Sequence, residues 1–448
     1  MRRIAWLLLA VNSVLALAGA AEVRPHYGGT LRIMVREAPV SLDPARLSAA
    51  QGTRIFPLIF EGLTRFDTHG RLQPQLATRW QGDSSNQHWE VWLRTGAKFH
   101  DGTPLTAEAV ATSLRAANPA WAVSADGDSV VIETAAPDVE LPAELALPRN
   151  GITHRAGNKV VGTGPFAVSD WQPGKSLALA ANEDYWEGRP FADSVLVTLG
   201  QNWRQQIVAL ELGKADVVEA APEQARRLSS AGRTIVESPP DEVVALVFTR
   251  STQSEDEVRV RQALSAAIDR VSIVNVLLQG QGESSQTVLP NWMTGYAMLF
   301  GQEGEKAENA RVSGSAGTMT LSYDASDPTN QLIAERVALN ARDAGIRVQA
   351  VASPANADLV LARIGLASAQ PQLALQVAAG AAGLPAPQFQ GTSPEELYGR
   401  EKEMLQSGRI IPLAHVPEAT ALGPGVNGWH ADLAGGWHLA DVWLGSTP

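Results

Sequence analysis

At 448 residues the chain is longer than one hydrophobic core usually supports, so its length predicts two or more lobes. Apolar residues make up 45% of it, which is enough for packed cores and excludes a largely disordered protein. The formal net charge of −11 and the lack of a basic cluster exclude nucleic acid as the expected partner, because a phosphate backbone requires a basic face.

The N-terminus has the layout of a secretory signal peptide. Two arginines precede an apolar run from Ile4 to Ala18, and small residues follow it, so cleavage is expected after Ala20. A transmembrane anchor is the alternative, but the run is shorter than the ~20 residues that a span needs, and polar residues interrupt it. We therefore predict a signal peptide at residues 1–20.

The composition contains no cysteine. An exported chain without cysteine has no disulfides and lacks the lipid-modified cysteine that tethers many exported bacterial proteins. Loss of the signal peptide would also remove two arginines and make the chain more acidic. These features predict a soluble protein in the periplasm of a bacterium with two membranes.

Short elements alternate along the N-terminal third. Residues 30–35 form an apolar strand pattern, residues 51–63 have helical spacing, and residues 89–93 have strand spacing. A tight turn follows at Asp101-Gly102, and Thr106 is placed to cap the helix that comes after it. Further along, the stretch 318–352 has the pattern of a strand, a helix and a second strand, with Gly345 ending the helix.

The segment KFHDGTPLTAE, residues 98–108, raises the possibility of a catalytic or metal site. Once the turn and helix start are accounted for, only His100 and Glu108 remain as chemical groups, and two groups without a third partner make a poor site. The chain also lacks Gly-x-Ser-x-Gly and His-Glu-x-x-His motifs. We therefore expect a scaffold role for this segment, and no enzymatic activity.

Several segments together resemble the extracellular solute-binding proteins of family 5, the peptide- and nickel-binding receptors of ABC importers. The most characteristic stretch is ATRW followed by WEVWLRTGAKFHDGTPLTAEAVATSL. In matching order the chain also has FEGLTRFD, VGTGPF, NEDYWEGRP, ALELGKADVV, VRVRQALSAAIDR and GIRVQAV. The resemblance spans residues 28–444.

This resemblance implies an α/β fold of the type II periplasmic binding protein class (cluster C), with two lobes joined by a hinge and a small inserted domain. The implied divisions are lobe 1 at 28–47, 161–247 and 411–448, the inserted domain at 48–160, and a shortened lobe 2 at 248–410. Apolar strands at 243–249 and 410–416 stand where the chain should cross between lobes. The ligand is then expected in the cleft between the lobes.

Lobe 2 departs from the family pattern. Residues 352–409 are fewer than in the family and rich in Ala, Gly, Gln and Leu. None of their acidic residues matches the family's aspartate, which pairs with the terminal amine of a peptide. A peptide remains the expected ligand, with a nickel chelate or a sugar as alternatives.

The candidate ligand-binding residues lie on the loop after the first strand, on the two crossings and near an apolar turn: Glu37, Val40, Phe248, Arg250, Trp292 and His415. Glu37 suits a cationic group, although a solvated loop carboxylate is an equal alternative. Arg250 suits a carboxylate, bound through two hydrogen bonds. Trp292 could stack on a ligand, but packing is the more frequent role of a tryptophan.

The eight histidines are scattered, with no His-x-x-x-His pair, so we expect neither a metal site nor a cofactor. The resemblance implies a monomeric receptor that delivers its solute to an ABC permease in the inner membrane. A periplasmic sensor or scaffold with a degenerate cleft is the competing hypothesis.

Overall fold

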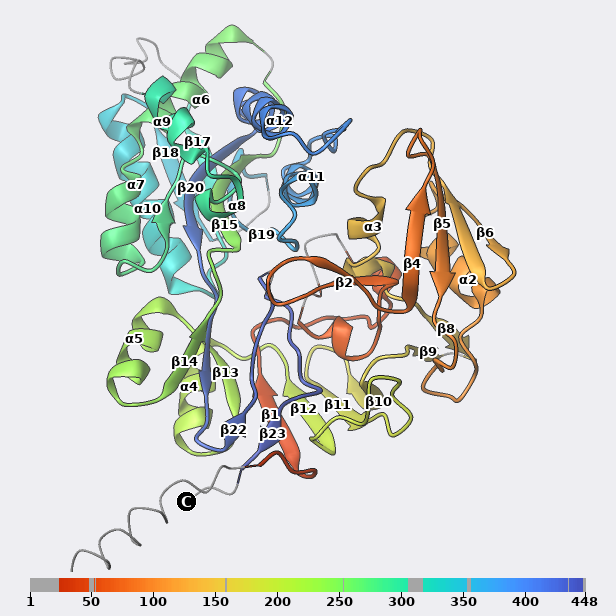
Figure 1. Ribbon diagram of the computed structural model, residues 1–448. Helices are drawn as coiled ribbons and strands as arrows, with labels where there is room; N and C mark the ends of the chain where they lie inside the picture. The colour runs from red at the N-terminus through yellow and green to blue at the C-terminus, as the bar shows by residue number, and fades with distance from the viewer. Residues whose placement is uncertain are drawn as a thin grey trace, which may run out of the picture.

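The computed structural model describes residues 24–47, 52, 54–157, 159–252, 254–304, 317–352, 356–433 and 435–445. The expected signal peptide, residues 1–20, lies outside these ranges. Within them, no helix combines the length and the apolar character needed to cross a bilayer. Three large sheets organise the chain, and Figure 1 shows them as three bodies.

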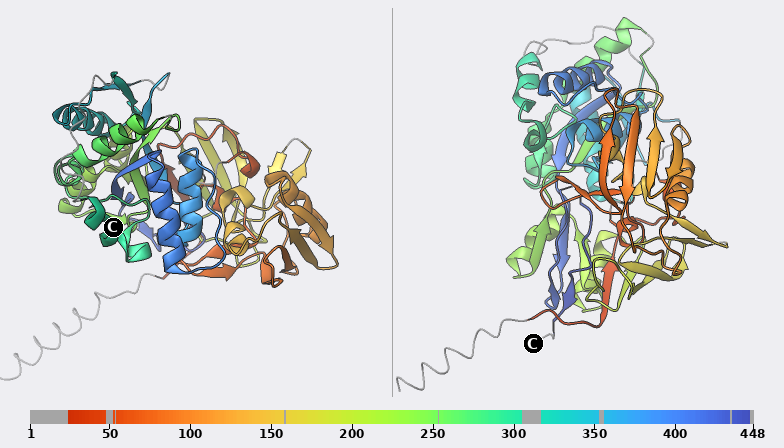
Figure 2. Two further views of the ribbon diagram at one scale, coloured as in Figure 1. Left: turned by 90° about the horizontal axis from the view of Figure 1, so that it is seen from above. Right: turned by 45° about the vertical axis from the view of Figure 1, so that its right-hand side comes forward.

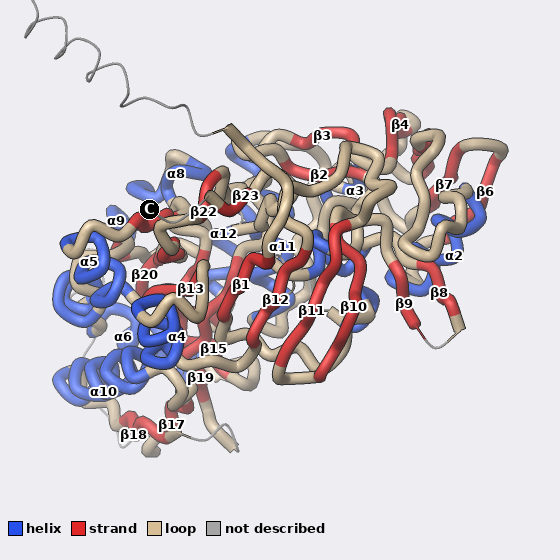
Figure 3. The backbone as a smooth tube through the Cα atoms, turned by 90° about the horizontal axis from the view of Figure 1, so that it is seen from below, coloured by secondary structure: helices blue, strands red, loops and turns tan. Residues whose placement is uncertain are grey.

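Lobe 1 is built on a seven-stranded sheet. Its strands, in sheet order, are β10 (Phe166–Gln172), β11 (Ser176–Ala181), β12 (Ser194–Thr198), β1 (Thr30–Met34), β13 (Val217–Ala220), β21 (Ala419–Leu422) and β14 (Thr234–Glu237). Strand β1 pairs in parallel with β12 and β13, and Figure 3 shows β1, β12, β11 and β10 side by side. Helices α4 (Trp203–Glu211) and α5 (Pro222–Ser230) pack near β13. Because the sheet contains both β1 and β21, segments from both ends of the chain meet in this lobe.

Lobe 2 is built on a six-stranded sheet with its own apolar core. The strands are β16 (Glu283–Ser284), β20 (Ile410–Val416), β15 (Glu242–Phe248), β19 (Leu359–Gly365), β17 (Met319–Ser322) and β18 (Val348–Val351). The helices are α6 (Glu255–Ala267), α7 (Arg270–Ser272), a π turn η4 (Ile273–Leu277), α8 (Asn291–Thr294), α9 (Ala297–Gly304), α10 (Pro328–Asp343), α11 (Pro371–Ala381) and α12 (Pro394–Gln406).

The expected strand, helix and strand at 318–352 are β17, α10 and β18, and the two strands run parallel. Gly345 follows the helix with a φ of 80°, a left-handed conformation that glycine adopts at little cost. Strands β15 and β20 are buried along almost their whole length, which explains their continuous apolar sequence.

The chain crosses between the two lobes twice. The crossing segments, 238–241 and 417–418, lead from β14 into β15 and from β20 into β21. Both long apolar strands pair within the sheet of lobe 2. The sequence-based bounds of lobe 2, 248–410, leave out nearly all of β15 and β20, although hydrogen bonding places both strands in that sheet.

The small domain has a four-stranded sheet in the order β4 (Ala77–Gly82), β5 (His88–Leu93), β7 (Ser129–Glu133) and β6 (Ala122–Asp126), packed against α2 (Ala107–Ala117). Short elements surround it: β2 (Thr64–Phe66), β3 (Leu72–Pro74), α3 (Leu141–Glu144), β8 (His154–Ala156) and β9 (Lys159–Val161). The right-hand view of Figure 2 shows lobe 1 at the bottom, with lobe 2 and the small domain above it.

The predicted cap of α2 is confirmed, because the Thr106 side chain accepts a hydrogen bond of 3.2 Å from the Ala109 amide. The helical expectation at 51–63 is wrong for the described residues, where a single 3₁₀ turn, η2 (Phe56–Leu58), is found. Tertiary bonding explains this difference, since the Ile59 carbonyl accepts from the Gly164 amide and is not available to continue a helix.

The KFHDGT segment is part of the scaffold. The His100 amide donates to the Gly162 carbonyl at 2.9 Å, and its ring Nε2 lies 3.0 Å from the carbonyl oxygen of Gly164. A Cβ atom at Gly162 would lie only 2.0 Å from the Ile59 carbonyl oxygen. The glycines of VGTGPF therefore let two backbones meet closely, which is a structural function.

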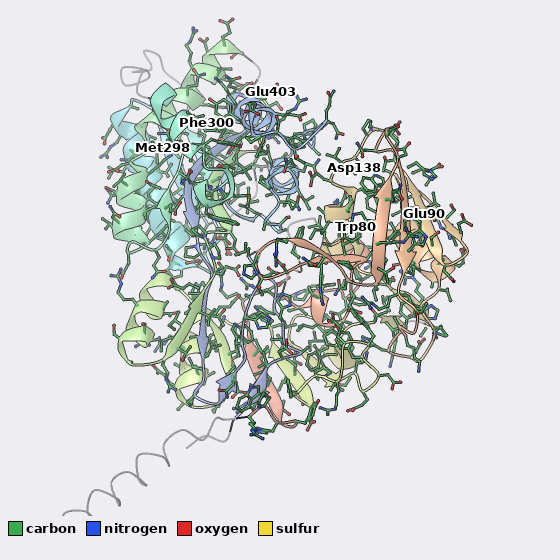
Figure 4. The ribbon with its side chains drawn as sticks, viewed as in Figure 1. Trp80, Glu90, Asp138, Met298, Phe300 and Glu403 are labelled. Atoms are coloured by element: carbon green, nitrogen blue, oxygen red, sulfur yellow. The ribbon has the colours of Figure 1, made fainter. Side chains whose placement is uncertain are left out.

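The small domain also contacts lobe 2. Phe66, Ala143 and Leu147 form a buried apolar cluster with Leu373 and Val377 of α11. Beside this cluster is a cavity of about 560 Å³, which Asp138 and Gln376 line from opposite sides. Figure 4 shows Asp138 on the side of the small domain that faces lobe 2.

Candidate functional site

The two crossing segments are hydrogen-bonded to each other. The Ser238 amide donates to the Glu418 carbonyl, and the Glu418 amide donates to Ser238 Oγ, both at 2.9 Å. The Ser238 hydroxyl in turn donates to Oδ1 of Asp241 at 3.0 Å. The chain therefore passes between the lobes through two short segments that are hydrogen-bonded to each other, an arrangement suited to act as a hinge.

A cavity of about 380 Å³ opens at these crossings. Its lining comes from lobe 1, from the crossings and from lobe 2, and it includes six carboxylates: Glu37, Glu219, Asp241, Glu242, Asp324 and Glu418. Three arginines line it as well, Arg36, Arg54 and Arg363. The cavity therefore has an excess of negative charge.

We call this space the hinge cavity. Arg54 is its central cation. It forms ion pairs with Glu219 and Glu418, including a bond of 3.1 Å from its Nε to Oε2 of Glu418. Burial disfavours its charge, but Glu418, Glu219 and Glu37 outweigh that effect and raise the pKa of Arg54. Arg54 therefore remains charged and holds several carboxylates around it.

Glu219 projects from the middle of lobe 1. It accepts hydrogen bonds from the Arg36 amide at 2.7 Å and from Nε2 of Gln206 at 3.1 Å. Burial alone would raise its pKa, but the charges of Arg54 and Arg36 outweigh burial, so the pKa of Glu219 is lowered. This carboxylate is therefore fully occupied by protein partners.

One ion pair spans the two lobes. Nη1 of Arg36, which follows β1, lies 3.7 Å from Oδ2 of Asp327 in lobe 2. The Arg36 guanidinium also lies over the Trp203 ring, 3.9 Å from the ring centroid. Asp327 is 2% exposed and caps α10, accepting from the Thr329 amide at 2.9 Å. The pair therefore links the end of β1 in lobe 1 to the start of α10 in lobe 2.

Arg363, near the end of β19, is the cation of the lobe 2 wall. Its Nε lies 2.6 Å from Oε1 of Glu242, and its Nη1 lies 3.8 Å from Oδ2 of Asp327. Burial opposes its charge, but Glu242 and Asp327 outweigh that effect, so the pKa of Arg363 is raised. All three arginines thus contact carboxylates of the protein.

A larger cavity of about 760 Å³ adjoins the hinge cavity and shares Ala367 with it. Arg65, Glu187 and His438 line this second space, between lobe 1 and the small domain. Ala367 has a φ of 57°, which is uncommon for a residue other than glycine and costs about 1 kcal/mol or more. Strained backbone of this kind is concentrated at functional sites.

The structure places Glu37 at the hinge cavity, as a lining residue. Burial raises the pKa of Glu37, although the charge of Arg54 opposes this effect. Val40, only three residues further along the same loop, is 82% exposed and does not line the cavity. The loop therefore contributes its first residues to the site and turns away from it.

Phe248 and Arg250 lie away from the cavity. The crossing comes before Glu242, and both residues follow at the other end of β15, about 20 Å along the strand. Phe248 is 3% exposed, with the Arg261 guanidinium 3.9 Å from its ring centroid. Nη1 of Arg250 lies 2.8 Å from Oε1 of Glu257.

Trp292 and His415 hold the structure around the crossings. Trp292 Nε1 donates to the Pro240 carbonyl at 2.8 Å, and the residue is 37% exposed. His415 is 1% exposed, with Nε2 3.0 Å from the Val288 carbonyl oxygen. Burial lowers the pKa of His415 to about 4, so its ring is neutral.

Sequence reasoning missed the charged residues that line the hinge cavity together with Glu37, among them Arg36, Arg54, Glu219, Asp241, Arg363 and Glu418. A usable signal was present, because most of them lie at or next to an end of an apolar strand, where side chains meet at one edge of a sheet. Within the described residues, no group of three or more histidines and carboxylates is arranged to hold a metal ion.

Comparison with known proteins agrees with this architecture. The chain is 27% identical over 335 residues to a protein of Escherichia coli (strain K12) named "Probable D,D-dipeptide-binding periplasmic protein DdpA". The alignment covers 66% of this chain and 65% of that protein, so the chain spans just under two thirds of that relative's length.

Two solved structures share the fold. NikA from Staphylococcus aureus, in complex with Ni(L-His)2, superposes with a TM-score of 0.78 at 17% identity, covering 93% of this chain and 99% of that one. The dipeptide binding protein from Pseudoalteromonas sp. SM9913, in complex with Met-Leu, superposes with a TM-score of 0.79 at 16% identity, covering 93% and 100%. The expected two-lobed periplasmic binding protein fold is confirmed.

The family resemblance is also confirmed. Residues 71–389 match the family described as "Bacterial extracellular solute-binding proteins, family 5 Middle". This match covers well over half of the chain, including most of the small domain and most of lobe 2. The chain therefore belongs to family 5 of the bacterial extracellular solute-binding proteins.

Proposed function

We propose that this chain is the solute receptor of an ABC importer, and that it closes its two lobes on a dipeptide or oligopeptide. The observation that carries the proposal is the hinge cavity, because residues of both lobes line it and one of them, Arg36 of lobe 1, pairs with Asp327 of lobe 2. When both walls contact a ligand, binding favours the state in which the walls are close together.

The names of relatives support a peptide as the solute, since one is named as a D,D-dipeptide-binding protein and another holds Met-Leu. We further propose that the protein acts as a periplasmic monomer, exported by its N-terminal segment, and that it delivers the solute to a membrane permease. The adjoining cavities, of about 380 and 760 Å³, are large enough for a short peptide.

Native mass spectrometry of the protein from a periplasmic extract, followed by a thermal-shift screen, tests this proposal. The screen contains dipeptides to octapeptides, amino acids, sugars and nickel–histidine. A retained peptide mass, or a rise in melting temperature with peptides alone, is the expected result. A rise in melting temperature with nickel–histidine or a sugar would show that the solute is that compound and not a peptide. Absence of binding by every class of compound would favour a sensor or scaffold.

A matched pair of variants locates the binding. Arg363→Gln removes a cation from the cavity wall, whereas Arg155→Gln removes an arginine that is paired with Asp43 and mostly exposed. If the solute binds in the hinge cavity, Arg363→Gln reduces the thermal shift and Arg155→Gln does not. Equal shifts in both variants would place the binding elsewhere.

A further inference from the structure

We infer that the small domain takes part in closure, because helix α11 of lobe 2 docks on it through an apolar contact that acts as a latch. The closed arrangement is then a contact of three bodies, which are lobe 1, lobe 2 and the small domain. The inference goes beyond the proposed function and rests on it in one respect, since the latch also helps to hold the solute.

Helix α11 has two apolar faces. Its sequence, PQLALQVAAGA, contains no charged side chain. Ala374 and Leu375 pack into the core of lobe 2, whereas Leu373 and Val377 belong to a separate apolar cluster. Leu373 and Val377 are four residues apart, so they share one face of the helix. A helix that is apolar on both faces needs a partner on each of them.

The small domain provides the second partner. Phe66 at the end of β2, Ala143 in α3 and Leu147 shortly after α3 are all buried against this face. Figure 1 shows α11 on the side of lobe 2 that faces α3. Together the two sides form a set of six residues, which we call the latch cluster: Phe66, Ala143, Leu147, Ala367, Leu373 and Val377.

A second close contact between the same two bodies lies near the latch cluster. Gly70 is in the turn between β2 and β3, and Ala369 is in the segment that leads into α11. A Cβ atom built at Gly70 would lie only 2.5 Å from the Cβ atom of Ala369. Glycine therefore lets the backbone of the small domain approach lobe 2 closely. The docking of α11 is a packed interface, supported at two places.

The latch cluster forms a wall between two cavities. Phe66, Leu147 and Ala367 line the cavity of about 760 Å³ between lobe 1 and the small domain. Leu147, Leu373 and Val377 line the cavity of about 560 Å³ on the other side. Ala367 lines the hinge cavity as well. The docking of α11 therefore closes off one end of the space that we propose for the solute.

The chemistry of the latch cluster suits a contact that opens and closes. Burial of apolar surface is favourable without directional bonds, and parting two apolar faces leaves no hydrogen-bonding group without a partner. Opening would expose the large side chains of Phe66, Leu147, Leu373 and Val377 to water. The closed arrangement is therefore favoured even before a solute binds, and the affinity for the solute rises with the fraction of closed protein.

The test uses the full mature chain. Leu147→Ser changes the small-domain side of the latch cluster, Leu373→Ser changes the α11 side, and a third protein carries both substitutions. The control is Leu339→Ser, at a leucine of α10 that is 42% exposed. Small-angle scattering without solute measures the radius of gyration, hydrogen exchange measures the protection of the α11 amides, and calorimetry measures the binding of trialanine.

Both single substitutions are expected to enlarge the radius of gyration, and the double variant should enlarge it no further, because either change alone opens the same contact. Leu147→Ser should also speed hydrogen exchange in α11, although the substitution is in another domain. Trialanine should bind about tenfold more weakly to each variant. Leu339→Ser should change none of these. Should Leu373→Ser fail to fold, Leu147→Ser tests the latch from the opposite side.

Two results would overturn the inference. The first is a radius of gyration that both single variants share with the wild type. The second is an additive increase in the double variant, which would indicate two local effects in place of one shared contact. If trialanine did not bind to the wild type, that result would count against the proposed function, whereas the scattering without solute would still decide the inference.

Discussion

Ser238 and Glu418 exchange hydrogen bonds between the two segments that join the lobes, each amide donating to the other residue. Through its hydroxyl, Ser238 also holds Asp241, and through its carboxylate, Glu418 holds Arg54. The same pair of residues therefore fixes the path of the chain and positions the charges of the cavity. This coupling is a physical link between hinge geometry and the candidate binding site.

Ser238→Ala should destabilise the protein by about 1 to 3 kcal/mol, because it removes the acceptor of the Glu418 amide and a donor to Asp241. Urea unfolding measures the loss. Ser229→Ala, in the exposed face of α5, is the matched control and should change the free energy of unfolding by less than about 0.5 kcal/mol. Equal effects of both substitutions would contradict the hinge role.

Asp327→Asn should favour the open arrangement of the lobes. Asparagine can still cap α10, so the helix is retained, but the charge that faces Arg36 and Arg363 is lost. Small-angle scattering without ligand is expected to show a larger radius of gyration than in the wild type. The control is Asp343→Asn, at an exposed aspartate on the same helix, and it should leave the radius of gyration unchanged. An unchanged radius of gyration in Asp327→Asn would show that the ion pair does not hold the lobes together.

Glu401 should make stability depend on pH. It is fully buried, accepts from the amides of Val288 and Leu289 and from the Tyr296 hydroxyl, and burial raises its pKa to about 7. The folded state keeps the proton of Glu401, whereas the unfolded state releases it near the ordinary pKa of about 4.3. The contribution of Glu401 to the free energy of unfolding is therefore fully present below a pH of about 4.3. It is lost as the pH rises through about 7.

The stability of the wild type relative to Glu401→Gln should therefore fall by about 1 to 3 kcal/mol between about pH 4.5 and about pH 7.5. Thermal unfolding across this range measures the difference. Glu403→Gln, on the exposed side of the same helix, is the control for which no such trend is expected. A constant or rising difference for Glu401→Gln would show that Glu401 is ionised in the folded protein.

Gly162→Ala should prevent stable folding, since its Cβ would meet the Ile59 carbonyl oxygen at 2.0 Å. Gly399→Ala should instead raise the free energy of unfolding by about 1 kcal/mol, because Gly399 lies inside α12 with open space around it. Melting temperatures of both variants test the pair. A well-folded Gly162→Ala protein would show that the backbones of the two segments can separate.

The sequence predicted the family, the two-lobed fold and much of the local structure, because those depend on short-range patterns. Thr106 caps its helix as expected, and the motif residues prove to be structural. The segments FEGLTRFD, VGTGPF and NEDYWEGRP meet at buried Glu61, which accepts from Thr163 at 2.7 Å and from Tyr185 and Trp186 at 3.0 Å. Motifs of this kind identify a fold without identifying its ligand.

The candidate site was less predictable, because it depends on long-range contacts. Arg36, Glu219 and Asp327 come from three distant parts of the chain, and only the pairing of sheets brings them together. The sequence-based bounds begin lobe 2 at residue 248, six residues after the start of β15 at Glu242. For this reason the expected site included Phe248 and Arg250, which lie at the opposite end of that strand. Glu37 does line the hinge cavity, because its loop follows the first strand directly, and its part in binding stays a prediction.

Small-angle scattering with and without solute is the most direct test of the central claim, that two lobes close on a small solute at the hinge cavity. The measurement uses the wild type with each class of compound that raises its melting temperature. The account predicts a smaller radius of gyration with the bound solute, and a reduced change in Arg363→Gln, which removes a cation from the cavity wall. A solute that binds tightly without compacting the protein would contradict closure of the lobes.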